Sequence, residues 1–197
     1  KVFQVPASRL AQFLGIYRGV RYQKRLSREV MRHVAVPETY ERVVFEGPGH
    51  HGLQRSETPQ VGPDEVLIQV AYAGVCAHDL AVANGSTGHG EKVTVQYPIV
   101  PGHEYSGIVV RCGSQVAHLR KGQKVAGRCA IGCGNCSACE VGDYYGCANK
   151  GEAGGINANG AYAQYLAMHP KHVHKLPLDM PLKYGVLVEP VAMCLEG

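Results

Sequence analysis

The sequence contains no tryptophan and only three phenylalanines. Glycine and proline are plentiful by contrast, with 25 and 11 copies. Such a composition favours short strands joined by turns over long helices. With 197 residues, 45% of them hydrophobic and 18% charged, the chain is long enough for one globular domain. We therefore expect a mainly β domain.

Long apolar runs are also missing. No uncharged stretch approaches the roughly 18 residues that a membrane-spanning helix needs, and no charged-then-apolar secretory signal opens the chain. These absences predict a cytoplasmic protein without a membrane span.

The chain has little excess charge outside its first segment. Residues 1–36 carry a net charge of +7, whereas the remainder carries −3 and has no basic stripe interleaved with aromatic residues. The sequence therefore argues against a nucleic acid as partner of the main domain.

The basic front segment has its own periodicity. Apolar residues recur at helical spacing between Ser8 and Val34, and Ser8 is a plausible N-cap. We expect residues 1–39 to form a basic helical extension that packs on its own chain or on a partner. Membrane-surface and organelle-targeting interpretations stay open.

From Glu41 onward, short β-branched stretches alternate with glycine, proline and aspartate turns. This pattern predicts a small barrel within a second domain, residues 40–197. The expected strands cover residues 42–45, 66–72, 106–111, 123–128, 161–167 and 172–176. Short helices are predicted over residues 77–84, ending at Gly85, and from about Glu189, with Pro190 at an early position.

Four of the eight cysteines lie close together in the sequence, at Cys133, Cys136, Cys139 and Cys147. Thiolates two residues apart can converge on one ion, and four of them satisfy tetrahedral zinc without an open position. Such a site performs no chemistry and instead stabilises a loop with few apolar residues. A disulfide pair and an iron–sulfur centre are alternatives, and a nucleic-acid-binding zinc ribbon is another, although it usually pairs two distant knuckles.

The spacing C-x2-C-x2-C-x7-C resembles the structural zinc lobe of the medium-chain alcohol dehydrogenase-like family. The resemblance extends from about Glu41 to the end of the chain and implies a GroES-like β barrel. Two earlier segments, Gly74–Asp79 and Pro101–Glu104, are similar to the two catalytic-zinc segments of that family and occur in the expected order.

The resemblance implies a second zinc ion, bound by Cys76, His103 and Glu189. A catalytic zinc needs three protein ligands and a vacancy. The segment Val188-Glu189-Pro190 resembles the Glu-Pro segment of the polyol, sugar and threonine dehydrogenases. Cys194 is the rival for the third position, because the simple alcohol dehydrogenases usually have cysteine there.

Three neighbouring residues receive roles from the same resemblance. Glu104 resembles a glutamate that lies close to the metal and exchanges onto it, or only supports the ligands. Asp79 resembles the aspartate that accepts the other ring N–H of the histidine ligand; an exposed aspartate at a helix start is its alternative. His78 stands where the family usually has serine or threonine, so its role as the proton relay stays open.

The sequence has no convincing dinucleotide-binding motif. Gly47–Gly52 matches G-x-G-x-x-G, but two prolines and no helical periodicity follow it, so we expect a hairpin turn. Gly154–Gly160 precedes a strand, which is the wrong order. In the resembled family a doubly wound nucleotide-binding (Rossmann) domain follows. We expect it to be missing here, because the chain ends directly after an apolar run that begins at Tyr184, and this ending looks cut.

The leading hypothesis is the catalytic domain of a zinc- and NAD(P)-dependent dehydrogenase of the sorbitol or threonine type, with two zinc ions per chain. Its substrate would be a small secondary alcohol, such as a polyol, sugar or amino alcohol. The resemblance also implies a homo-oligomer when intact. The alternative is a zinc-stabilised binding module without catalysis.

Overall fold

The computed structural model of the chain describes residues 35–86 and 95–196. The helical segment expected between Ser8 and Val34 lies outside the described residues. Strands dominate the rest, which confirms the mainly β class. The strands are β1 (Thr39–Gly47), β2 (His50–Glu57), β3 (Val66–Ala73), β4 (Tyr105–Cys112), β5 (Lys124–Gly127), β6 (Ala130–Ile131), β7 (Gly151–Ala153), β8 (Asn157–Ala158), β9 (Tyr165–Met168) and β10 (Val173–Lys175).

The helices are short. They are α3 (Ala77–Ala83), α4 (Ser137–Glu140), α5 (Leu182–Gly185), α6 (Val188–Glu196) and the 3-10 helix η1 (Pro170–His172). The two helices expected from the sequence correspond to α3 and α6. None of the helices in the described ranges has the length and apolar character that crossing a membrane requires.

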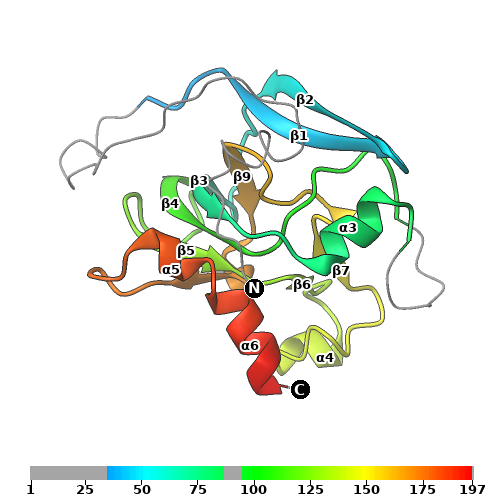
Figure 1. Ribbon diagram of the computed structural model, residues 1–197. Coiled ribbons are helices and arrows are strands. Elements are labelled where there is room, and N and C mark those ends of the chain that lie inside the picture. The colour runs from blue at the N-terminus through cyan, green and yellow to red at the C-terminus, as the bar shows by residue number, and fades with distance from the viewer. Residues whose placement is uncertain (1–34, 87–94, 197) are drawn as a thin grey trace.

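A five-stranded antiparallel sheet in the order β10-β5-β4-β3-β9 forms the centre of the fold (Figure 1). Side chains of a strand alternate between the two faces of a sheet. Accordingly, Val66 and Ile68 of β3 belong to one hydrophobic cluster, while Leu67 between them belongs to the other. The sheet is therefore buried on both faces, and its strands are fixed on either side.

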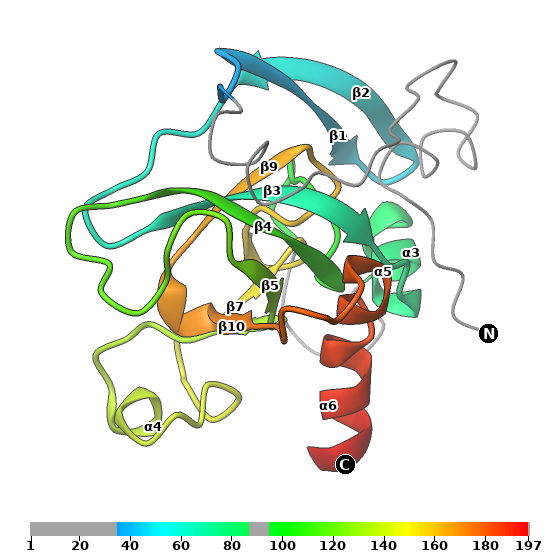
Figure 2. The ribbon, with the colours of Figure 1, turned by 90° about the vertical axis from the view of Figure 1, so that its left-hand side faces the viewer.

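The β1–β2 hairpin packs over the central sheet (Figures 1 and 2). Its turn lies at Gly47–Gly49, as the sequence predicted for this glycine-rich segment. Isolated bridges from Arg42 to Ala163 and from Phe45 to Ile99 connect β1 to the rest of the fold. Residues 161–164 contact β1 through one isolated bridge and two backbone hydrogen bonds, and the strand expected over 161–167 is regular only in β9.

A separate small lobe follows β5. It contains α4 and the three-stranded sheet β6-β7-β8, and Figure 2 shows the loop with α4 extending away from the central sheet. One contact from this loop reaches the last helix, because the Tyr145 hydroxyl donates to Met193 Sδ of α6 at 2.8 Å.

Candidate metal centres

The four cysteines of the lobe converge as their spacing predicted. The sulfur atoms of Cys133, Cys136, Cys139 and Cys147 all lie within 4.8 Å of one another. No disulfide joins any of the eight cysteines. The backbone N–H of Cys133 donates to Cys147 Sγ at 3.4 Å, and this hydrogen bond lowers the pKa of the Cys147 thiol to about 7. Four converging thiols, one of them easily ionised, match the closed tetrahedral site of a structural zinc ion.

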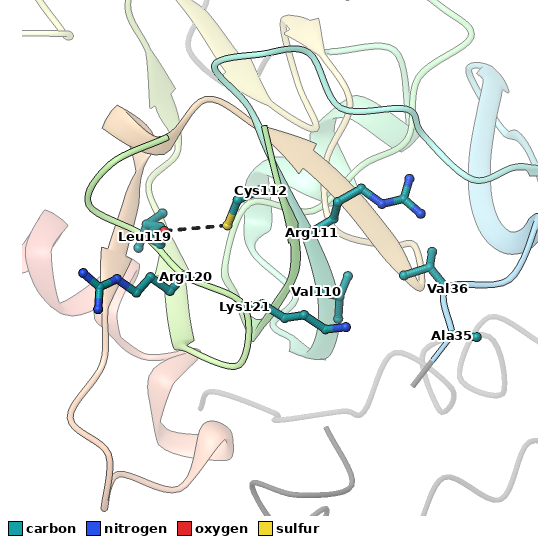
Figure 3. A pocket seen from close by; sticks show the side chains of 8 residues that line it. All are labelled: Ala35, Val36, Val110, Arg111, Cys112, Leu119, Arg120 and Lys121. Atoms are coloured by element: carbon teal, nitrogen blue, oxygen red, sulfur yellow. Dashed lines mark hydrogen bonds between the residues drawn. The ribbon is translucent and has the colours of Figure 1, made fainter. Parts of the chain in front are cut away.

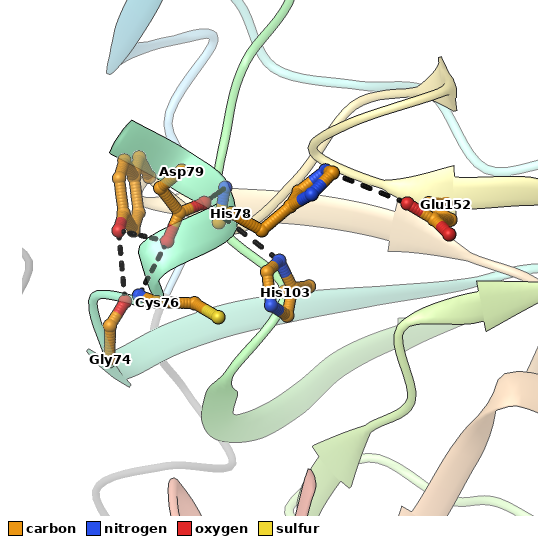
Figure 4. Close-up of polar contacts among 8 residues, drawn as sticks. Gly74, Cys76, His78, Asp79, His103 and Glu152 are labelled. Carbon is orange, nitrogen blue, oxygen red and sulfur yellow. Dashed lines mark hydrogen bonds and ion pairs between the residues drawn. The ribbon is translucent and has the colours of Figure 1, made fainter. Parts of the chain in front are cut away.

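A second group of metal-binding side chains lies where α3 and β4 begin. Cys76 directly precedes α3, and His103 and Glu104 directly precede β4. Their ligand atoms lie within 4.8 Å of one another. Figure 4 shows the Cys76 sulfur and the His103 ring facing each other. Segments that are 27 residues apart in the chain thus meet at one point.

Asp79 connects these two segments. Its carboxylate accepts the Cys76 backbone N–H at 2.8 Å and the Gly102 backbone N–H at 3.1 Å. It also accepts the Tyr162 hydroxyl at 2.8 Å. The His103 Nδ1 atom lies 3.8 Å from Asp79 Oδ1, longer than a hydrogen bond. Asp79 is therefore a buried anchor, not an exposed residue at a helix start, and it holds the backbone on either side of the thiol and the imidazole.

Two glycines allow the close approach of these segments. Gly102 has a φ of 97°, and a Cβ there would meet the Tyr162 ring at 2.4 Å. A Cβ on Gly74 would meet Glu104 Oε2 at 2.2 Å. Only glycine fits at both positions without displacing these side chains, so the orientation of His103 and Glu104 depends on them.

Glu189 reaches the same region from the first turn of α6. Its carboxylate forms a further group with His103 and Cys129, in which the ligand atoms again lie within 4.8 Å of one another. His103 belongs to both groups, whereas Cys76 and Glu189 do not fall within one group. Cys194 is exposed and belongs to neither.

The site is crowded with acidic groups in a poorly solvated environment. Burial, together with the nearby Glu104, Asp79 and Glu152 carboxylates, raises the pKa of Glu189 to about 7. Burial also raises the pKa of Glu104 and lowers the pKa of His103. Burial is the largest cause of all three shifts, because it disfavours the charged form of each group.

His78 points toward the same space (Figure 4). Its ring centroid lies 5.8 Å from that of His103, and its Nε2 atom lies 3.6 Å from Glu152 Oε2. Its side chain is only 12% exposed. His78 therefore faces the metal-binding side chains rather than bulk solvent.

The sequence alone did not indicate a role for three residues of this site, which are Cys129, Glu152 and Tyr162. Cys129 lies between β5 and β6, Glu152 in β7 and Tyr162 before β9. Cys129 lies four residues before the cysteine repeat. The one feature of the sequence that could have pointed to it is that cysteine is a common metal ligand. Nothing in the spacing of Glu152 and Tyr162 marks them.

The chain resembles known proteins over most of its length. Residues 62–178 match the family model described as the alcohol dehydrogenase GroES-like domain. The L-threonine 3-dehydrogenase of a Chelativorans strain is 34% identical over 139 residues, which are 71% of this chain and 40% of the relative. The sorbitol dehydrogenase of Bombyx mori is 31% identical over 154 residues, which are 78% and 44%.

A solved structure has the same architecture. A protein from Sinorhizobium meliloti 1021, described as a zinc-binding dehydrogenase and bound to NADP, matches with a TM-score of 0.71 at 31% identity, over 81% of this chain and 44% of that one. The chain thus spans less than half the length of the relatives it matches.

Proposed function

The chain belongs to the alcohol dehydrogenase GroES-like domain family, and from that premise we propose that it is the catalytic part of a zinc-dependent dehydrogenase. The enzyme would transfer a hydride between a secondary alcohol and NAD(P). The observation that carries the proposal is that buried His103 lies within 4.8 Å of the ligand atoms of Cys76 and Glu104 in one group and of Glu189 in another. NAD(P) binding is not assigned to the described residues, because the matched residues make up only 40% and 44% of these two relatives.

The donor atoms at this site suit zinc. A thiolate, a neutral imidazole and carboxylates are all ligands that zinc accepts, and a catalytic zinc needs three of them with one position free for substrate. The lowered pKa of His103 keeps its imidazole neutral and able to ligate. Burial first, and the nearby carboxylates second, raise the pKa of Glu189, and a divalent cation bound there would favour its charged form.

Zinc bound there would act as a Lewis acid and lower the pKa of a substrate alcohol. The protein contributes position and exclusion of water. Asp79 fixes both ligand-bearing segments through its backbone hydrogen bonds, and the Tyr162 hydroxyl, which contacts Asp79 and the Gly74 carbonyl, locks this arrangement.

His78 is proposed as the group that receives the substrate proton. Its Nε2 atom faces the Glu152 carboxylate at 3.6 Å, and this carboxylate would stabilise the protonated ring. Glu152 also adds a second polar group beside the metal-binding side chains. A hydroxyl or ammonium group next to the reacting carbon of a substrate would form a hydrogen bond with the Glu152 carboxylate. This favours polyols, sugars and amino alcohols as substrates.

The lobe has a different role. Zinc bound by its four cysteines would stabilise the loop around α4 and take no part in catalysis. Homo-oligomer formation and a cytoplasmic location stay predictions.

The proposal is tested on the full-length protein by a zinc count and by NAD(P) reduction with a panel of secondary alcohols. We expect two zinc ions per chain and reduction of NAD or NADP by at least one polyol, sugar or amino alcohol. One zinc ion per chain, held by the lobe, without any reduction would instead favour a zinc-stabilised binding module.

A further inference from the structure

We infer that Cys129 is an additional ligand of the metal at the catalytic site, where it binds together with His103 and Glu189. This inference rests on the proposed function, because it requires that the site holds a metal ion. The inference is based on the position of the Cys129 sulfur, which lies within 4.8 Å of the ligand atoms of His103 and Glu189. The three residues come from three separate parts of the chain.

The position of Cys129 is fixed by the strands around it. It lies between β5 and β6, and its carbonyl accepts the backbone N–H of Ala153 at 3.0 Å. The adjacent Arg128 N–H donates to the His172 carbonyl at 3.1 Å. These bonds fix the backbone on both sides of Cys129, and with it the point from which its side chain reaches the site.

The charges of the two ligand groups make each a complete set for a divalent ion. Cys129 and Glu189 supply two negative charges when ionised, and neutral His103 adds a nitrogen. Cys76 and Glu104 supply the same charges in the second group that contains His103. His103 belongs to both groups, so an ion bound to its imidazole can take one thiolate from each of them.

A second thiolate would change the chemistry of the site. Thiolates are soft donors that select zinc over hard cations such as magnesium. With Cys76 and Cys129 both available, the site would retain its metal more tightly than a site with one thiolate. We therefore expect Cys129 to act on metal retention first and on turnover through that effect.

The test uses the full-length protein loaded with 113Cd, a zinc substitute whose NMR resonance moves downfield with each thiolate ligand. The wild-type protein should give one resonance from the four-cysteine lobe and a second from the catalytic site. In Cys129→Ser and Cys129→Ala the second resonance should move upfield while the first stays. Zinc release to a chelator from that site should also become faster, by roughly tenfold or more.

Cys112→Ser is the matched control. Cys112 is also a partly buried free thiol, but it lies at the far end of β4 from His103 and Glu104, where its sulfur donates to the Leu119 carbonyl (Figure 3). Its replacement should move neither resonance.

The outcomes separate this inference from the proposed function. A second resonance that stays in place in both Cys129 variants would overturn the role of Cys129 and leave the metal site intact. A wild-type spectrum with only the lobe resonance would remove the catalytic metal, and the inference with it.

Discussion

The two candidate metal centres differ in how the chain builds them. The lobe takes all four ligands from 15 consecutive residues, Cys133 to Cys147. The proposed catalytic site would take its ligands from segments at Cys76, His103 and Glu189, which the central sheet and α6 bring near one another. A local site depends on its metal to fold, whereas a site assembled by the sheet has its shape before any metal binds. This difference predicts opposite consequences when ligands are removed.

The largest loss of stability is expected for Cys136→Ser. The lobe has few apolar residues of its own, so the free energy of metal binding is the free energy that orders it. We expect the free energy of unfolding to fall by about 3 kcal/mol or more, which would lower Tm by roughly 10 °C. Thermal unfolding measured by calorimetry, with a zinc count, checks this.

Cys194→Ser serves as its control, because this thiol is exposed on α6 and belongs to neither metal group. It should change neither the zinc count nor Tm. If Cys136→Ser had the same Tm as Cys194→Ser, the lobe would not need its metal for stability.

Asp79→Asn is expected to have the next largest effect. Its carboxylate accepts three hydrogen bonds, from Cys76 N, Gly102 N and the Tyr162 hydroxyl. The amide has one acceptor oxygen, so at least one buried donor loses its partner, at a cost of about 1–3 kcal/mol. Zinc affinity at the catalytic site should fall roughly 10–100-fold, because both ligand segments lose their anchor.

Chemical denaturation and a zinc competition titration measure these two effects. Tyr162→Phe is the control, since it removes one of the three bonds and leaves the carboxylate in place. Tyr162→Phe should lower the free energy of unfolding and the zinc affinity by less than Asp79→Asn does. An equal or larger loss would contradict the anchoring role of Asp79.

This contrast also explains what the sequence could and could not predict. The lobe was predictable because its ligand spacing is a local property that survives in any fold. The candidate ligands Cys76, His103 and Glu104 could be proposed only through family resemblance, and the structure brings them close together. Cys129 was not, because nothing local relates it to His103; their proximity depends on the pairing of β4 with β5.

The fold shows the same division. Strands with β-branched residues, such as β3, were predicted to within a residue. β2 was missed, because its sequence HHGLQRSE is polar and largely exposed and forms a strand only through pairing with β1. The turn at Gly47–Gly49 was correctly predicted from its glycines, but the strand that follows it was determined by tertiary contacts.

A smaller, pH-dependent effect is expected where the lobe meets the barrel. The ring of buried His172 lies 5.0 Å from the Tyr144 ring of the lobe. Burial, helped by the nearby His169 and Arg128, lowers the pKa of His172 to about 4. Because this pKa lies below that of an unfolded histidine, the folded state is favoured above pH 6.5 and loses this advantage as the pH falls toward 4.

The loss should be on the order of 2 kcal/mol between pH 7 and pH 4. His172→Phe removes the titrating group and keeps a ring against Tyr144, so its stability should fall less over the same range. His50→Asn, on the exposed hairpin turn, should follow the wild type. Urea denaturation of the three proteins at each pH measures the difference, and parallel curves for wild type and His172→Phe would exclude this contribution.

The smallest effect on stability is expected for Glu189→Ala, although it removes a catalytic ligand. The Glu189 carboxylate is buried near Glu104, Asp79 and Glu152, and its raised pKa shows that its charged form is disfavoured in the fold. Its loss removes a buried carboxylate, which offsets part of the stability lost with the zinc ion, so the free energy of unfolding should fall by clearly less than it does in Cys136→Ser. One of the two zinc ions should nevertheless be lost on dialysis, and NAD(P)-linked activity with it. Retained folding with one zinc ion, measured by calorimetry and metal analysis, would establish the contrast with Cys136→Ser, whereas equal unfolding of the two variants would show that both sites are structural.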